Sequence, residues 1–225
     1  MPLETIPWNE APRGSLRFYR DLALNLASRY PFNVKKDFDR RMRRRAEELL
    51  KERHYDLVIC DFVQMARNAV GLPAPASLLF QHNVEAQIFA RHTAAAENWA
   101  MRNYMWLQWK KMFAFESAAG RAFDRVIAVS QQDRETFSQD YGWQHVDVIE
   151  TAVDTEYFQP QVTQCHEPRV VFVGSLDWLA NQDGVEHFVQ TTWPRVTARV
   201  PEARFQIVGR NPPTAMKQLE KVPGV

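Results

Sequence analysis

Short runs of apolar residues alternate with longer amphipathic stretches along this chain. The apolar runs are rich in Val, Ile, Leu and Phe and occupy residues 56–62, 77–82, 125–130, 146–150, 170–174 and 205–209. The amphipathic stretches lie at roughly 14–29, 36–53, 84–120, 131–140 and 184–199. Strands that alternate with helices predict an α/β fold in which parallel sheets are flanked by helices. Because the strands are almost continuously apolar, we expect both faces of each sheet to be covered.

The alternation of strands and helices is interrupted between Asp154 and Arg169, where aromatic and polar residues precede the next expected strand and helix. We place the domain boundary there, with one domain over residues 1–160 and a second over 161–225. The first domain begins with helices, although a parallel α/β domain normally begins with a strand. The second has two strands, too few for a core of the usual size. We therefore expect both domains to be incomplete at the ends of the chain.

Composition narrows the class of protein. The 28 Lys and Arg residues oppose 27 Asp and Glu residues, and the formal net charge of +1 favours no nucleic-acid partner. No apolar run approaches the ~20 residues that cross a bilayer. Cys60 and Cys165 are far apart, and their spacing matches neither a metal site nor a disulfide framework, which fits a reducing cytosol. We expect a cytoplasmic protein, either soluble or peripheral at the inner membrane.

A local basic patch has two interpretations. Five arginines cluster in one expected helix: Arg40, Arg41, Arg43, Arg44 and Arg45. The helix is amphipathic, with Phe38, Met42, Ala46 and Leu49 on its apolar stripe, so the arginines could contact anionic lipid head groups. Alternatively they form a solvated face that pairs with the glutamates at 47, 48 and 52.

Candidate chemistry lies where the expected strands end. The chain has no Gly-rich dinucleotide or phosphate-loop motif and no His-Glu-x-x-His motif. Polar residues at the carboxyl ends of parallel strands line the ligand crevice of open α/β sheets. His82, Asn83 and Glu85 follow one such strand, and His82 could accept a proton or a hydrogen bond from a substrate. In the alternative, Asn83 caps a helix and His82 is an ordinary loop residue.

Two other strand ends carry polar or small residues. Ser130 ends a strand, where its hydroxyl could face an anion or, as the simpler explanation, cap the next helix. Gly174, Ser175 and Asn181 follow the first strand of the second domain. A glycine there lets backbone N–H groups approach a phosphate, although a tight turn also needs small residues.

Seven segments, taken in order, resemble the retaining family 4 glycosyltransferases of the GT-B fold, whose domains are Rossmann-like. They resemble in particular the bacterial sugar transferases of exopolysaccharide and PEP-CTERM gene clusters. The segments are YDLVICDF (55–62), FQHNVE (80–85), WKKMFAFE (109–116), DRVIAVSQQD (124–133), VDTEYFQP (153–160), VFVGSLDWLANQDG (171–184) and FQIVGRNPP (205–213).

The resemblance implies transfer of a hexose from a nucleoside diphosphate sugar to a saccharide or lipid-linked acceptor, with retention and without a metal or cofactor. His82 matches the family's acceptor-side histidine, beside Asn83 and Glu85, and Ser130 matches a residue that faces the cleft between the domains. The donor side would comprise Gly174, Ser175, Asn181, Gly209 and Arg210.

The sequence also departs from the family pattern. Thr151 and Ala152 replace the usual Asn-Gly, and Ser175, Leu176 and Asp177 stand where many members carry cations. The family's glycine-rich loop and its pair of glutamates would lie outside the chain, so we expect weak donor binding and little activity. The alternatives are a nucleotide-sugar epimerase of the same fold and a non-catalytic binding or scaffold module.

Overall fold

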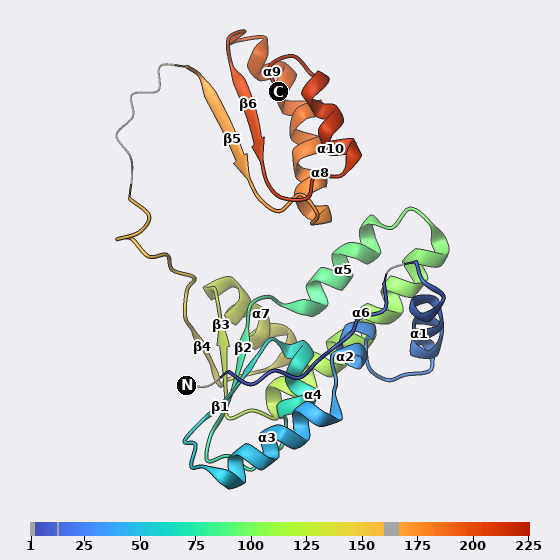
Figure 1. The fold of residues 1–225 in the computed structure, drawn as a ribbon, viewed down its shortest axis with the longest axis vertical. Coiled ribbons are helices and arrows are strands. Elements are labelled where there is room, and N and C mark those ends of the chain that lie inside the picture. Colours follow the sequence, from blue (N-terminus) through green and yellow to red (C-terminus); the bar gives the residue numbers. More distant parts are fainter. Residues whose placement is uncertain (1–2, 13, 160–166) are drawn as a thin grey trace. The chain divides into compact units, whose positions relative to one another are not determined.

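The computed structural model describes residues 3–12, 14–159 and 167–225 (Figure 1). The chain divides into two compact units, Met1–Val153 and Asp154–Val225. Each unit is described by itself. The boundary expected between residues 160 and 161 lies in the segment 160–166, outside the described residues.

The first unit contains a four-stranded parallel sheet whose order, β1-β2-β3-β4, follows the chain. Its strands are Val58–Asp61 (β1), Ser77–Gln81 (β2), Arg125–Ala128 (β3) and Val146–Val148 (β4). Its helices are Leu16–Leu26 (α1), Phe32–Lys36 (α2), Arg40–Glu52 (α3), Ala66–Ala69 (α4), Glu85–Ala95 (α5), Trp99–Arg121 (α6) and Gln131–Tyr141 (α7), with a 3-10 turn at Val63–Met65.

The second unit pairs two parallel strands, Arg169–Val173 (β5) and Arg204–Val208 (β6). Between them, helix Leu179–His187 (α8) continues through a π-helical turn, Phe188–Thr192, into Trp193–Thr197 (α9). Helix Thr214–Gln218 (α10) and a 3-10 turn, Leu219–Lys221, follow β6. Trp193 and Phe205 are central to the core of this unit. The α/β fold with parallel sheets and flanking helices is therefore confirmed in both units.

All six expected strands are present, with ends that differ from the expectation by no more than two residues. The helices match less well. The single helix expected over 84–120 is two helices, α5 and α6, because Asn98 caps the second by accepting hydrogen bonds from the N–H groups of Ala100 and Met101. The helix expected from residue 184 begins at Leu179, although Asn181 and Gly184 are typical turn residues.

The N-terminal helices also differ in number. Two helices expected over 14–29 and 36–53 are three, and the third begins only at Arg40, because the Asp39 carboxylate accepts from the N–H of Arg41. Ser15 caps α1 in the same way, through the N–H of Phe18.

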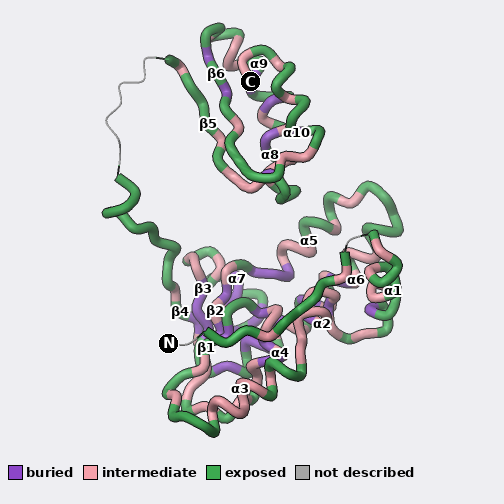
Figure 2. Tube along the Cα trace, in the orientation of Figure 1, coloured by how far each residue is buried: buried purple, intermediate pink, exposed green. Residues whose placement is uncertain are grey.

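The faces of the two sheets are buried to different extents. Four residues that lie in register across the first sheet are all buried: Cys60, Leu79, Val126 and Val146. Ile59, which points to the opposite face, is 60% exposed, and four of the five residues of β5 are exposed (Figure 2). The expectation that both faces are covered therefore holds for β3, whose consecutive residues 126–128 are all buried, but not for β1 or β5. Successive right-handed crossovers that advance in one direction place their helices on one side of a sheet.

The basic patch on α3 is largely paired with carboxylates. The helix carries ion pairs between Arg43 and Glu47, Arg44 and Glu48, Arg45 and Glu52, Arg41 and Asp39, and Arg45 and Glu4. These pairs are those expected of a solvated face. Lipid head groups would have to compete with them for the same guanidinium groups.

Candidate functional site

His82 follows the last residue of β2 and lies beside the carboxyl end of β1. Its Nε2 is 2.6 Å from Oδ1 of Asp61, the last residue of β1. The pair forms because β1 and β2 are parallel neighbours, so their ends meet at the same edge of the sheet. The two side chains are 35% (His82) and 64% (Asp61) exposed, so a ligand from solvent can reach them.

Aromatic rings hold the imidazole of His82 in place. The ring of Phe62 stacks on it at 4.0 Å between centroids and 20° between planes, and Phe80 meets it edge-on at 4.8 Å. Phe62 has a φ of 66°, in the left-handed region that a bulky residue rarely adopts. Strain of this kind costs on the order of 1–3 kcal/mol and clusters at functional sites. The backbone at the end of β1 is thus bent in the conformation that stacks Phe62 on His82.

The turn after His82 is held by a different residue than expected. The N-cap of α5 is Val84, which makes no side-chain capping bond, so the alternative in which Asn83 caps the helix is wrong. Glu85 is buried. Burial raises the pKa of its carboxyl, against hydrogen bonds from Gln64 and Asn83 that lower it. Of the three candidates around this turn, His82 and Asn83 reach solvent and Glu85 faces inward.

Glu116, in α6, supplies the support that a cap would otherwise give. Its carboxylate has no exposed surface. It accepts four hydrogen bonds, from Gln81 Nε2, the N–H groups of Glu85 and Ala86, and Tyr141 Oη, at 3.0, 3.0, 3.0 and 2.7 Å. Burial raises the pKa of Glu116 to about 7, against the lowering effect of these hydrogen bonds.

This buried carboxyl should give the protein a pH-dependent stability. The folded protein holds a proton on Glu116 up to about pH 7, whereas the unfolded chain releases it near pH 4.5, the ordinary pKa of a glutamate. Between these values the folded state binds more protons, so we expect the free energy of unfolding to fall by about 3 kcal/mol as the pH rises through this window. Urea denaturation at pH 5 and pH 8 measures the difference. The Glu116→Gln variant should lose this fall, and an equal fall in both proteins would contradict the assignment.

Ser130 lies at the same edge of the sheet, two residues beyond β3. Its Oγ accepts a hydrogen bond from the N–H of Asp133 at 3.1 Å and donates one to Asp133 Oδ2 at 2.8 Å. The capping explanation is therefore confirmed. Both hydrogen bonds of the Ser130 hydroxyl go to Asp133 in the first turn of α7. Capping thus explains the serine at this position without a bound anion.

In the second unit, the ends of β5 and β6 bring the expected donor-side residues together. Arg210 Nε donates to Ser175 Oγ at 2.8 Å, and Asn181 Nδ2 donates to the carbonyl oxygen of Ser175 at the same distance. Gly174 and Gly209 directly follow the adjacent strands β5 and β6, and a Cβ on Gly209 would overlap the carbonyl oxygen of Gly174. All five candidates thus meet around one turn.

Asp177 adds a negative charge to this turn. Hydrogen bonds from Asn211 and Ser175, together with the positive charge of Arg210, hold the pKa of Asp177 below its usual value. Asn211 itself has a φ of 51°. Ser175 thus lies between the guanidinium group of Arg210 and the carboxylate of Asp177 and is hydrogen-bonded to both.

The comparison with known families bears on the first unit. The family model described as Glycosyltransferase Family 4 matches residues 7–157, more than half of the chain. The chain belongs to Glycosyltransferase Family 4. The predicted membership is thus confirmed, and with it the general activity of a glycosyltransferase. A search of the curated proteins finds no match.

The matched span of this family 4 transferase includes two residues that sequence analysis did not select, Asp61 and Glu116. Asp61 is a carboxylate at the end of an apolar strand, the same kind of position that singled out His82. Glu116 lies four residues after Met112 and three before Ala119, both buried, so it is a charged residue on the apolar face of a helix. A charge in such a position is rarely buried unless it is paired or hydrogen-bonded.

Neither a metal nor a membrane span is indicated in the described ranges. Within 3–12, 14–159 and 167–225 there is no group of three or more His, Cys, Asp or Glu residues that could hold a metal ion. Over the same residues, no helix of this family 4 transferase is long and apolar enough to cross a membrane.

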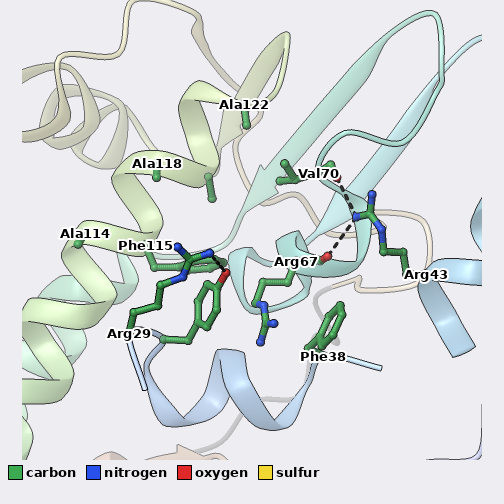
Figure 3. A pocket seen from close by; sticks show the side chains of 11 residues that line it. Arg29, Phe38, Arg43, Arg67, Val70, Ala114, Phe115, Ala118 and Ala122 are labelled. Atoms are coloured by element: carbon green, nitrogen blue, oxygen red, sulfur yellow. Dashed lines mark hydrogen bonds between the residues drawn. The ribbon is translucent and has the colours of Figure 1, made fainter. Parts of the chain in front are cut away.

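A cavity of about 560 Å³ lies among α4, α6 and the segment around Tyr30 (Figure 3). Its walls include the α6 alanines and three arginines. The guanidinium group of Arg67 lies over the rings of Tyr30 and Phe38, at 3.8 and 4.0 Å, and Arg43 donates to the carbonyl oxygens of Arg67 and Val70. Arg67 and Arg43 therefore pack against the walls of the cavity through contacts within the protein. The cavity contains none of the candidate site residues of the transferase.

Proposed function

We propose that this family 4 transferase moves a hexosyl group from a nucleoside diphosphate sugar to a hydroxyl of a polysaccharide or glycolipid acceptor, with retention at the anomeric carbon. The observation that carries the proposal is the pairing of His82 with Asp61 at the carboxyl edge of the sheet, inside the span that matches the family. The proposal involves no metal or cofactor besides the donor. Its setting is exopolysaccharide assembly in a bacterial cytoplasm, with α3 as a peripheral contact to the inner membrane.

On the acceptor side, the tautomer of His82 follows from its partner. Because Nε2–H donates to the Asp61 carboxylate, Nδ1 keeps its lone pair and can accept a hydrogen bond from the acceptor hydroxyl. The hydroxyl oxygen bonds to the anomeric carbon on the face from which the leaving group departs. The bond from that carbon to the diphosphate oxygen breaks, and its electron pair leaves with the diphosphate. The hydroxyl proton passes to Nδ1, and Asp61 stabilises the imidazolium that results.

On the donor side, the turn after β5 would hold the diphosphate. Gly174 and Gly209 let the two strand ends approach each other closely, because a Cβ at either position would meet neighbouring protein atoms. Arg210 provides a positive charge, and Asn181 fixes the turn through its bond to the Ser175 carbonyl oxygen. Asp177 opposes an anion at this position, so we expect the affinity for the diphosphate to depend strongly on Arg210.

A thermal melt of the purified chain with UDP, GDP and their sugars tests the donor side. A ligand that binds only the native state, at ~100 times its dissociation constant, adds about 2.7 kcal/mol of stability. We expect one nucleotide to raise the Tm and the Arg210→Gln variant to lose most of that rise. No rise with any nucleotide at millimolar concentration would overturn the donor assignment.

The product then distinguishes the function from its alternative. Incubation of the chain with the stabilising sugar nucleotide and candidate saccharide or lipid acceptors should release the nucleoside diphosphate. NMR of the product should show the anomeric configuration of the donor. Conversion of the sugar nucleotide into an epimer, with no diphosphate released, would instead indicate an epimerase.

A further inference from the structure

Glu116 joins three elements of the first unit through one buried carboxylate. We infer that Glu116 is a positioning residue for His82, acting through the turn that carries the imidazole. The inference rests on the proposed function only in so far as His82 is the acceptor-side residue. The geometry that supports it is independent of any substrate.

The hydrogen bonds of Glu116 enclose the turn on both sides. Gln81 precedes His82, and its side chain donates to Oε1. The N–H groups of Glu85 and Ala86, just after the turn, donate to Oε1 and Oε2. Residues 82–84 therefore span a short loop whose two ends are fixed to the same carboxylate.

The fourth bond ties this arrangement to α7. Tyr141, the last residue of α7, donates its hydroxyl to Oε2. Burial and the neighbouring Glu116 raise the pKa of Tyr141, so the phenol remains protonated and available as a donor. The four donors match the acceptor positions of the ionised carboxyl, the form that Glu116 takes above about pH 7, and they offset the cost of burying it.

Another buried polar residue of α6 shows what a purely structural anchor looks like. Gln108, two turns earlier, is 1% exposed. It donates to Asn25 Oδ1 and accepts from the N–H of Phe32, both at 2.8 Å. These contacts attach α6 to α1 and α2, and neither involves the turn at 82–84. Three of the four bonds of Glu116, by contrast, go to residues that flank this turn.

The alignment of His82 is sensitive to this support. Its imidazole must stay within hydrogen-bond distance of Asp61 and between the rings of Phe62 and Phe80. Because the turn has no side-chain cap of its own, a loss of the acceptors at Glu116 leaves two backbone N–H groups unpaired. We expect the turn then to sample other conformations, in which His82 separates from Asp61.

The test compares Glu116→Gln with Gln108→Leu as a matched control on the same helix. In Glu116→Gln, the new amide group meets the N–H of Ala86 donor to donor. Nitrogen-15 NMR of the imidazole reports the tautomer, and the His82 signals are assigned by comparison with the His82→Ala variant. At pH 8, where Glu116 is ionised, we expect the single Nε2–H tautomer in the wild type and Gln108→Leu, and an average of the two tautomers in Glu116→Gln. Hydrogen exchange at the Ala86 amide should be at least tenfold faster in Glu116→Gln than in the wild type, and unchanged in Gln108→Leu.

The outcomes separate the inference from a general loss of stability. A folded Glu116→Gln variant whose His82 signals match those of the wild type would overturn it, as would equal changes in Gln108→Leu. If Glu116→Gln does not fold, Tyr141→Phe removes one donor to Oε2, and we expect a shift of the His82 signals in the same direction but smaller. No such shift in folded Tyr141→Phe also overturns the inference. Neither readout uses a substrate, so a chain that shows the His82 effect without sugar transfer would refute the proposed function alone.

Discussion

The His82→Ala variant is expected to lose about 100- to 1000-fold in kcat/KM for sugar transfer, since a positioned general base contributes roughly two to four orders of magnitude. The acceptor hydroxyl would lose its partner at Nδ1, and Asp61 would lose the imidazolium that it stabilises. The measurement is the initial rate of nucleoside diphosphate release with a saturating acceptor.

The control for this prediction is His92→Ala, which makes the same change at an exposed position of α5. It should keep the rate of the wild type. The rise in Tm with the nucleotide should be the same in all three proteins, because the donor-side residues lie in the other unit. If kcat/KM of His82→Ala lies within a factor of three of the wild-type value, His82 is not the general base.

Gly209→Ala is expected to destabilise the second unit by about 3 kcal/mol, the upper part of the usual range for overpacking. The added Cβ would overlap the carbonyl oxygen of Gly174, and a backbone atom cannot move aside as a flexible side chain can. The ends of β5 and β6 would have to separate, and with them Ser175 and Arg210. We therefore expect the variant to unfold at a lower urea concentration than the wild type and to show no rise in Tm with the nucleotide.

Gly184→Ala is the matched control in the same unit. A Cβ at residue 184 meets no atom within 4 Å, and the residue lies inside α8. Alanine is the better helix former there, so stability should rise by up to about 1 kcal/mol. Gly209→Ala with the stability of the wild type would show that the two strand ends are free to separate.

The two units also divide the proposed chemistry. The first unit holds a histidine fixed by a carboxylate and two aromatic rings, which suits a neutral hydroxyl. The second holds a guanidinium group at the turn that follows β5, which suits a phosphate. Each unit can therefore be tested by its own variants, as the predictions for His82 and Gly209 do.

The sequence by itself determined the strands and part of the site. Its apolar runs predicted all six strands, because a strand that packs into a core needs several consecutive β-formers. It selected His82, Ser130 and Gly174, because the end of a strand can be located from the apolar run that precedes it. Seven ordered segments were enough to indicate the family.

Only the tertiary structure decided which residues meet. Asp61 and His82 are 21 positions apart, and their contact depends on β1 and β2 being parallel neighbours in one register. Glu116 acts on a turn about 30 positions away, so its role depends on how α6 packs against the end of β2. The exposure of Ile59, which lies within an apolar strand, also depends on how the packed unit covers each face of the sheet. Local propensity specifies elements, whereas pairing, burial and hydrogen bonds between distant residues arise from the free energy of the whole packed unit.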